Sequence, residues 1–156
     1  MRISEILTED YVVTGLEGSS KEAIIDALID LAARSPKVLD KEKVRTAIFE
    51  REKIMSTGVG NGFAIPHGKT DAVSDIVASF AVTAEEIDYE SLDEKPVRLV
   101  FLLVGKDNLV GPHIKLLSRI SRLMNKEEFR RRLLECTSQK EIMGLFRQEE
   151  ASYFEV

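Results

Sequence analysis

The segment 51–69 gathers residue types that could handle a phosphoryl group. It contains four of the nine glycines of the chain and one of its two histidines, His67. Glycines at alternate positions allow the backbone to turn several N–H groups toward one point, an arrangement that suits anions. Imidazole is the side chain most easily made a nucleophile near neutral pH. A histidine beside an anion-binding loop therefore predicts phosphoryl chemistry.

His67 is the candidate acceptor. A histidine with an ordinary pKa of about 6.5 is mostly neutral at neutral pH, and its free nitrogen can attack phosphorus to form a phosphoramidate. The alternative is a histidine that happens to end a loop. We favour the acceptor because Pro66 restricts the backbone before His67 and Gly68 after it has no side chain. Such a combination of a restricted and an unusually free backbone is unfavourable unless it serves a function. The sequence leaves open which ring nitrogen attacks.

The glycine-rich loop is predicted to hold the phosphoryl oxygens. The residues assigned to this phosphate loop are Thr57, Gly58, Gly60, Gly62 and Gly68. A nucleotide-binding loop is the rival interpretation, since Gly68-Lys69-Thr70 looks like the end of a P-loop. That motif needs a glycine where the chain has Phe63, and the loop glycines also miss the spacing of the dinucleotide-binding motif. We therefore disfavour nucleotide binding.

Two further side chains are candidates for stabilising the phosphoryl group. His113 stands near the predicted start of a helix, where a neutral imidazole could donate a hydrogen bond to a phosphoryl oxygen and the helix N-terminus favours an anion. Arg51 immediately precedes the glycine-rich loop, so its guanidinium could clamp the same oxygens. The alternatives are a capping or partly buried histidine and an arginine on a solvated helix surface. Lys69 is a weaker candidate of the same kind as Arg51.

Composition argues against several other classes of protein. A net charge of −5 disfavours nonspecific nucleic-acid binding. The single cysteine, Cys136, excludes an internal disulfide framework, and two distant histidines lack metal-ligand spacing, so we expect neither a metal nor a cofactor. The N-terminus lacks the apolar core of a signal peptide, and the longest apolar run, 99–104, is too short to span a bilayer. We expect a cytoplasmic protein without direct membrane insertion.

Capping signals and apolar periodicity predict five helices. The first is predicted to start at the capping box Ser19-Ser20-Lys21-Glu22 and to end before Pro36, and the other predicted starts are Asp40, Pro112, Asn125 and Ser138. Short apolar runs predict three strands, at 63–65, 76–82 and 97–104, the last stopped by Gly105. The acidic stretch 85–94 is predicted to be an exposed connection.

Helices on both sides of the strands predict a single α/β sandwich domain over residues 1–147, followed by a short C-terminal tail at 148–156. Continuous apolar runs fit strands covered on both faces of a sheet. Periodicity alone does not give the order of the strands.

Two motifs resemble the enzyme IIA component of the bacterial phosphoenolpyruvate:sugar phosphotransferase system, in its fructose/mannitol and nitrogen-regulatory class, type 2. The first motif joins Arg51-Glu-Lys, Ser56-Thr-Gly-Val-Gly-Asn-Gly and Ile65-Pro-His-Gly-Lys69, and the second is the helix beginning His113-Ile-Lys-Leu-Leu. The resemblance extends from about residue 3 to residue 146. It implies a three-layer α/β sandwich with a mixed, mostly parallel sheet. Phe63, in place of a more usual aliphatic residue, and Gly111-Pro112 before His113 are departures from the pattern.

The resemblance also implies roles and partners. His67 matches the phosphoryl-accepting histidine, Arg51 the arginine beside it, and His113 the second histidine of the site. The chain would be a phosphohistidine carrier, a transferase component that takes a phosphoryl group from the phosphocarrier HPr or a relative. It would pass that group to a IIB domain for sugar uptake. The alternative is a nitrogen-regulatory type whose phosphorylation state controls binding to target proteins. The lack of fused IIB or membrane segments favours this alternative.

Overall fold

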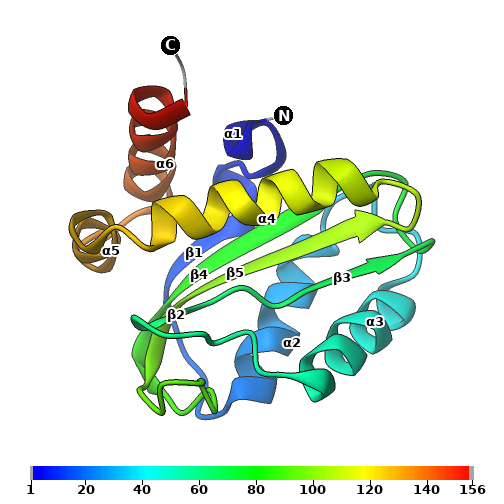
Figure 1. The fold of residues 1–156 in the computed structure, drawn as a ribbon, viewed down its shortest axis with the longest axis horizontal. Helices are drawn as coiled ribbons and strands as arrows, with labels where there is room; N and C mark the ends of the chain where they lie inside the picture. The colour runs from blue at the N-terminus through cyan, green and yellow to red at the C-terminus, as the bar shows by residue number, and fades with distance from the viewer. Residues whose placement is uncertain (1, 155–156) are drawn as a thin grey trace.

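Five strands form one mixed sheet in residues 2–154, the part of the chain that the computed structural model describes (Figure 1). The strands are β1 (Val12–Leu16), β2 (Phe63–Ala64), β3 (His67–Thr70), β4 (Val77–Ile87) and β5 (Val97–Lys106). β4 pairs in parallel with β1 and antiparallel with β5, while β2 and β3 follow one another along the other edge of β5, both in parallel. Three of the four pairings are parallel, which confirms the mixed, mostly parallel sheet.

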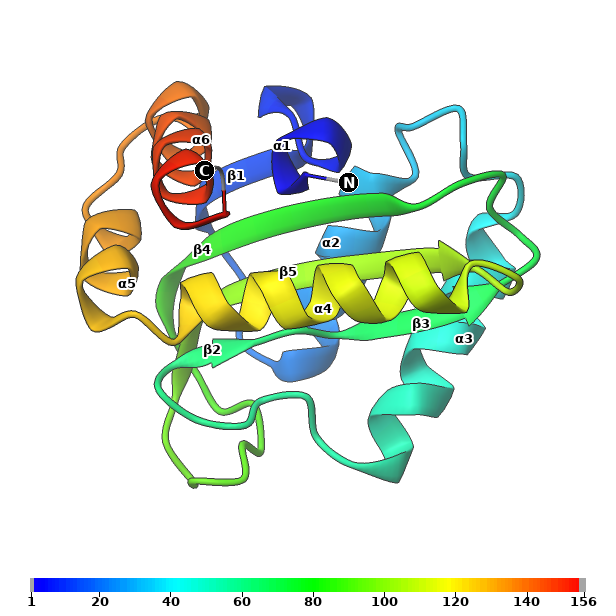
Figure 2. The same ribbon diagram turned by 45° about the horizontal axis from the view of Figure 1, so that its top comes forward.

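Helices cover both faces of this sheet and confirm the three layers (Figures 1 and 2). One face carries α2 (Lys21–Ala32) and α3 (Lys41–Ile54). The other carries α1 (Ile3–Ile6), α4 (Val110–Met124), α5 (Glu127–Leu134) and α6 (Gln139–Phe154). A short 3-10 helix at Glu9–Tyr11 leads into β1. Arg51, His67 and His113 thus come from α3, β3 and α4, one element of each layer.

The sheet is buried on both sides because its central strands, β4 and β5, are apolar at most positions. Along β5, Phe101 and Leu103 pack into the core under α4, α5 and α6, whereas Val100 and Val104 pack into the core under α2 and α3. Successive strand residues point to opposite faces, so an unbroken apolar run supplies both cores. Burial of both faces fixes the register of β5, on which β3 and His67 depend.

Three predicted helix starts are confirmed by their capping hydrogen bonds. Within the predicted box Ser19-Ser20-Lys21-Glu22, Ser20 is the cap, and its hydroxyl accepts the N–H of Ala23 at 3.1 Å. The Asp40 carboxylate accepts two N–H groups of the first turn of α3. The Ser138 hydroxyl accepts the N–H of Glu141 at 3.1 Å. These side chains satisfy backbone donors that have no partner inside the helix. The cap on α3 matters for the site because the same helix carries Arg51 in its last turn.

Two predicted boundaries beside the site were wrong. β5 does not stop at Gly105 but continues to Lys106, because β3 pairs with it there and places Lys69 opposite Gly105. α4 begins at Val110, so Pro112 is its third residue rather than its first. The first turn of a helix tolerates proline because its N–H groups have no intrahelical acceptors.

Two other predictions about loops were also wrong. The acidic stretch 85–94 is not simply an exposed connection, because β4 continues to Ile87, which pairs with Val97, and the Tyr89 side chain is fully buried. Asn125 does not cap α5, which follows Lys126 without a side-chain cap. The N–H of Asn125 instead bonds to the Ser121 carbonyl and closes the end of α4.

Helix α6 continues through the segment that we expected to be a tail and reaches Phe154, while residues 155–156 lie outside the described part. The Glu150 carboxylate of α6 is buried and accepts the N–H groups of Ile3 at 2.5 Å and Ser4 at 3.2 Å. It also lies 3.5 Å from the Arg119 guanidinium of α4. The last helix therefore holds both α1 and α4 in place. Within residues 2–154, none of the helices has the length and apolar composition that crossing a membrane requires.

Candidate functional site

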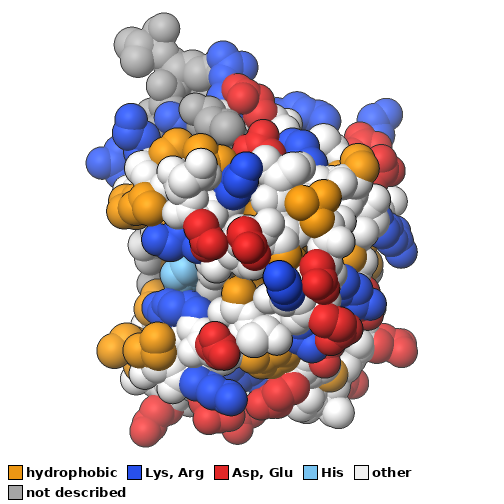
Figure 3. Space-filling model, turned by 90° about the vertical axis from the view of Figure 1, so that its right-hand side faces the viewer, with side chains coloured by type: hydrophobic (Ala, Val, Ile, Leu, Met, Phe, Trp, Pro, Cys, Tyr) orange, Lys and Arg blue, Asp and Glu red, His pale blue; other side chains and the backbone are white. Residues whose placement is uncertain are grey.

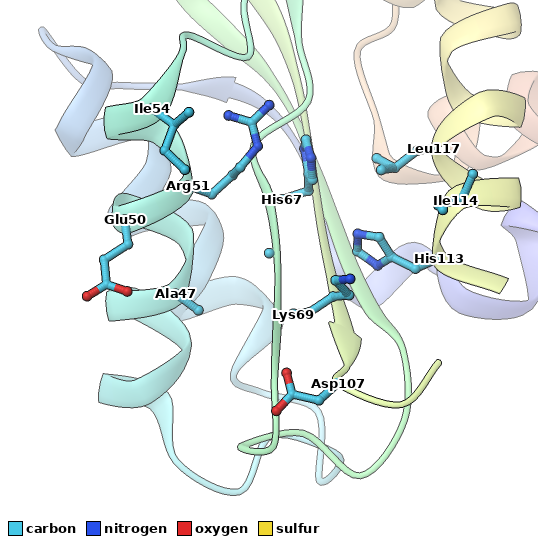
Figure 4. A pocket seen from close by; sticks show the side chains of 11 residues that line it. Ala47, Glu50, Arg51, Ile54, His67, Lys69, Asp107, His113, Ile114 and Leu117 are labelled. Atoms are coloured by element: carbon cyan, nitrogen blue, oxygen red, sulfur yellow. The ribbon is translucent and has the colours of Figure 1, made fainter. Parts of the chain in front are cut away.

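Four of the predicted site residues line one pocket of about 590 Å³ between α3 and α4: Arg51, His67, Gly68 and His113 (Figure 4). Arg51 comes from the last turn of α3, His67 and Gly68 from the start of β3, and His113 from the first turn of α4. Residues 62 positions apart in the sequence thus meet beside the edge of the sheet. The other lining residues are Ala47, Glu50, Ile54, Lys69, Asp107, Ile114 and Leu117.

The half-buried imidazole of His67 is held by one hydrogen bond that defines its tautomer. Its Nδ1 lies 2.8 Å from the carbonyl oxygen of Ile65. Because a carbonyl oxygen can only accept, Nδ1 must carry the proton and donate it. Nε2 is then the nitrogen with a free lone pair. The hydrogen bond answers a question that the sequence leaves open.

His67 is neutral near pH 7 in this environment. Burial lowers the pKa of its imidazole most strongly, and the neighbouring Arg51 guanidinium lowers it further. The hydrogen bond to Ile65 and the charge of Glu52 raise the pKa in part. Since the net effect lowers the pKa from its ordinary value, the lone pair of Nε2 is available at neutral pH.

His113 lines the pocket from α4 and faces His67. Its side chain is 3% exposed, and the two imidazole centroids are 5.9 Å apart. Neither ring nitrogen of His113 has a hydrogen-bond partner among the described residues. A buried polar group without a partner costs free energy. A hydrogen-bond acceptor carried by a group bound in the pocket could therefore satisfy the N–H of His113.

Gly105 makes room for this histidine. A Cβ atom at position 105 would lie 2.4 Å from Nδ1 of His113, so any larger residue there would displace the ring. Gly105 is followed by Lys106 at the end of β5 and then by the turn into α4. The absence of a side chain thus lets α4 bring His113 against the sheet.

Stability is expected to fall with acid more steeply in the wild-type protein than in His113→Gln. Burial first, and then the nearby His67 and Lys69, lower the pKa of His113 to about 4. Between this value and the unfolded value of about 6.5 the unfolded chain binds more protons, so the contribution of His113 is complete above that window and is lost as the pH falls through it. Urea unfolding at about pH 7 and about pH 5 measures the difference. An equal loss in both proteins would contradict the burial of a neutral His113.

Arg51 reaches the pocket from α3, and its guanidinium is held by Met55, the residue that follows the helix. One guanidinium nitrogen donates to the Met55 carbonyl at 3.0 Å, and Figure 4 shows the group extended toward His67. A guanidinium carries five N–H donors, so one bond to a carbonyl leaves others for an anion. Arg51 can therefore contact oxygens placed on Nε2 of His67 while its position is fixed.

The other four residues assigned to the phosphate loop, Thr57, Gly58, Gly60 and Gly62, do not line this pocket. Thr57 is buried, and both its N–H and its hydroxyl donate to the Glu52 carboxylate. A Cβ at Gly58 would lie 2.4 Å from the Ser91 hydroxyl, so this glycine allows close packing. Gly60 and Gly62 have φ values of 146° and 79°, which L-residues with side chains rarely adopt. The structure gives these positions roles in turning and packing the chain.

Gly68 lines the pocket, and its backbone also lies directly against α3. A Cβ there would be 3.2 Å from the Ala47 carbonyl oxygen. Glycine at this position therefore allows α3, which carries Arg51, to approach β3, which carries His67.

The pocket is also lined by three further charged residues, Glu50, Lys69 and Asp107. Of these, only Lys69 is a candidate from the sequence. Lys69 lies two positions after His67 in β3, so alternation along a strand places it on the same side. Asp107 follows the last residue of β5, and Glu50 precedes Arg51. Asp107 could have been found only by knowing that β3 and β5 are neighbours.

The surroundings of the pocket are partly apolar. Ile54 of α3 is 79% exposed and Ile114 of α4 is 59% exposed, and both line the pocket. Figure 3 shows a histidine at the surface between Lys and Arg side chains, with hydrophobic groups nearby on the same face. Exposed apolar side chains around a polar centre are typical of a surface that binds another protein.

Comparison with known proteins gives consistent matches. A sequence model of the family described as "Phosphoenolpyruvate-dependent sugar phosphotransferase system, EIIA 2" matches residues 5–149. The chain is 36% identical over 150 residues to the fructose-specific EIIABC component of Bacillus subtilis (strain 168), which covers 96% of this chain and 24% of that protein. It is 39% identical over 127 residues to the fructose-specific EIIA component of Haloferax volcanii, covering 81% and 82% of the two chains.

A solved structure agrees with these sequence matches. The crystal structure of the nitrogen regulatory protein IIA-Ntr from Neisseria meningitidis superposes with a TM-score of 0.87 at 32% identity, covering 92% of this chain and 98% of that one. Sugar-specific and regulatory proteins are thus both among the relatives. The chain spans about a quarter of the length of the Bacillus protein and most of the length of the other two.

Proposed function

Because this chain belongs to the EIIA type 2 family of the phosphoenolpyruvate-dependent sugar phosphotransferase system, we propose that it is a phosphohistidine carrier acting through Nε2 of His67. The donor would be an HPr-type phosphocarrier, and the acceptor a IIB domain that serves sugar uptake. The observation that carries the proposal is the hydrogen bond from His67 Nδ1 to Ile65, which leaves the Nε2 lone pair free beside Arg51 and His113. The exchange would take place in the cytoplasm.

The proposed step is a direct displacement at phosphorus. The Nε2 lone pair of His67 forms the new P–N bond, while the bond between phosphorus and the donor breaks and its electron pair leaves with the donor. The proton on Nδ1 stays in its hydrogen bond to Ile65, which stabilises the positive charge that develops on the ring. Such transfers depend on positioning and charge stabilisation.

Arg51 and His113 would stabilise the transferred group. The guanidinium neutralises the phosphoryl oxygens, and an N–H of neutral His113 donates to one of them. Hydrogen bonds to a charged group contribute roughly 1.5–3 kcal/mol each. A few bonds of this size hold the phosphoryl group and still allow it to be passed on, which suits a carrier.

The proposal is tested by mapping the phosphate. The full chain is incubated with phosphoenolpyruvate, the general phosphotransferase enzyme and HPr, and the product is analysed under alkaline conditions that preserve phosphohistidine. We expect one acid-labile phosphate on the peptide that contains His67. Phosphate on another residue, or none with an HPr that phosphorylates a known acceptor, would overturn the proposal.

Arg51→Ala is expected to slow phosphoryl transfer by about tenfold to a hundredfold, since it removes one or more charge-assisted hydrogen bonds to the phosphoryl oxygens. The stability of the fold should change little, because the guanidinium is partly exposed and, within residues 2–154, its hydrogen bond is to the Met55 carbonyl. Single-turnover transfer from phosphorylated HPr measures the rate. Arg45→Ala, on the same helix but outside the pocket and paired with Asp26, is the matched control. Equal rates for both variants would show that Arg51 has no part in transfer.

A regulatory carrier is the second candidate, and the Neisseria protein favours it, because it is named a nitrogen regulatory protein and matches nearly the whole described fold. The same phosphohistidine would then control binding to target proteins. Loss of uptake of one sugar in a deletion strain, with transfer to its purified IIB domain, supports the sugar carrier. Binding of a non-transport protein that depends on His67 phosphorylation, without transfer to any IIB domain, supports the regulator.

A further inference from the structure

Beside Arg51 in the sequence, Glu52 points away from the pocket into a buried polar cluster. Its side chain is 5% exposed, and its carboxylate lies 2.9 Å from Nζ of Lys21. It accepts the Thr57 N–H at 2.8 Å and the Thr57 hydroxyl at 2.5 Å, and the Tyr89 hydroxyl lies 3.3 Å away. Both carboxylate oxygens therefore have partners.

This cluster is connected to His67 through two backbone hydrogen bonds. The carbonyl of Thr57 accepts the N–H of Ile65 at 3.2 Å, and the carbonyl of Ile65 accepts Nδ1–H of His67 at 2.8 Å. The position of Thr57 thus determines the position of Ile65, and Ile65 determines which nitrogen of His67 carries the proton.

The same cluster is connected to Arg51. The Arg51 guanidinium donates to the carbonyl of Met55, two residues before Thr57. Met55 follows the end of α3, so the path of the chain from 55 to 57 decides where that carbonyl lies. Glu52 reaches forward from the helix and fixes this path at Thr57.

We propose that Glu52 is a positioning residue, which fixes the tautomer and orientation of His67 and the position of Arg51 through Thr57. A buried ion pair is a costly way to fill space, since apolar residues of similar volume often do so with equal or greater stability. Only an acceptor with two oxygens can hold the N–H and hydroxyl of Thr57 and the ammonium of Lys21 together. The consequence for phosphoryl transfer rests on the proposed function, but the consequence for the His67 ring does not.

The test is Glu52→Gln in the full chain, labelled with ¹⁵N and studied by NMR of the imidazole nitrogens. In the wild-type protein we expect the signals of one tautomer, with the proton on Nδ1 of His67. In Glu52→Gln we expect both tautomers, because the loop at Thr57 is no longer held. If the proposed function is also right, transfer from phosphorylated HPr falls by about tenfold to a hundredfold, the size expected of a small misplacement of reacting groups.

Glu150→Gln is the matched control, because Glu150 is an equally buried carboxylate that also holds backbone N–H groups and a cation. It separates a general loss of stability from an effect on His67, and we expect the wild-type tautomer in it. Lys21→Met/Glu52→Gln removes both charges and serves if the single variant does not fold. Thr57→Val loses the hydroxyl contacts with Glu52 and Tyr89 but keeps the N–H bond to Glu52, and in this milder variant we expect a smaller shift in the same direction.

The outcomes separate the two proposals. A single Nδ1–H tautomer in the folded Glu52 variants, or the same change in Glu150→Gln, overturns the positioning role. A wild-type protein that takes no phosphoryl group overturns the proposed function, while the tautomer comparison still decides the role of Glu52.

Discussion

His67→Ala is expected to take no acid-labile phosphate from phosphorylated HPr, whereas the wild-type protein takes one. The variant lacks the Nε2 lone pair that the hydrogen bond to Ile65 leaves free in the pocket, and His113, the other imidazole that lines the pocket, is only 3% exposed. Loss of a covalent acceptor cannot be compensated by the groups that stabilise the phosphoryl oxygens. Transfer followed over time by intact-mass spectrometry under alkaline conditions measures the effect.

The same variant should keep its fold. His67 is half-buried and hydrogen-bonded to the Ile65 carbonyl, so its removal costs about 1 kcal/mol beyond the lost packing. Urea unfolding of His67→Ala and wild type checks this, and a folded variant without label assigns the loss to chemistry. Labelling of folded His67→Ala at the wild-type level would refute the role of His67.

The sheet and the order of its layers follow from features that a sequence displays. Apart from Ser79 and Arg98, the runs 76–82 and 97–104 are apolar at consecutive positions, a pattern typical of strands covered on both faces. Ser20, Asp40 and Ser138 cap their helices because their short polar side chains reach backbone N–H groups within three residues. These interactions are local, so the residue types alone predict them.

The glycine-rich loop shows the limit of this reasoning. Alternating glycines indicate a backbone that can turn, but they do not indicate toward what it turns. Gly58 packs on Ser91 and Tyr89, whereas Gly68 allows α3 to lie close to the edge of the sheet. Both contacts depend on chain segments that are distant in the sequence.

Glu52 was hidden by its neighbours in the sequence. It lies between Arg51 and Lys53 in a run that reads as a solvated helix surface, and its partner Tyr89 lies in an acidic stretch. Successive residues of a helix point about 100° apart, so one of two adjacent charges can face a pocket while the other faces the core. Which of the two does so depends on how Lys21 of α2 and Tyr89, in the segment after β4, pack against α3, and the sequence pattern does not contain that.

His113→Ala is expected to slow phosphoryl transfer by about a hundredfold to a thousandfold, the cost of removing one donor aimed at developing negative charge. It should not abolish transfer, because Nε2 of His67 remains. His113→Gln keeps an N–H donor at a similar reach and is expected to recover part of the rate. The rate constant of a single turnover from phosphorylated HPr distinguishes the three proteins.

Gly105→Ala tests the role of the His113 imidazole without replacing His113 itself. The new methyl group would lie 2.4 Å from Nδ1 of His113 and must push the ring away from its place, so we expect a slower transfer although both histidines are present. Gly144→Ala, on α6, adds a methyl group that meets nothing within 4 Å and should leave the rate unchanged. If transfer is as fast in folded Gly105→Ala and His113→Ala as in Gly144→Ala, the buried imidazole does not contact the phosphoryl group. A loss confined to the first two variants would assign the unpartnered nitrogens of His113 to the phosphoryl oxygens.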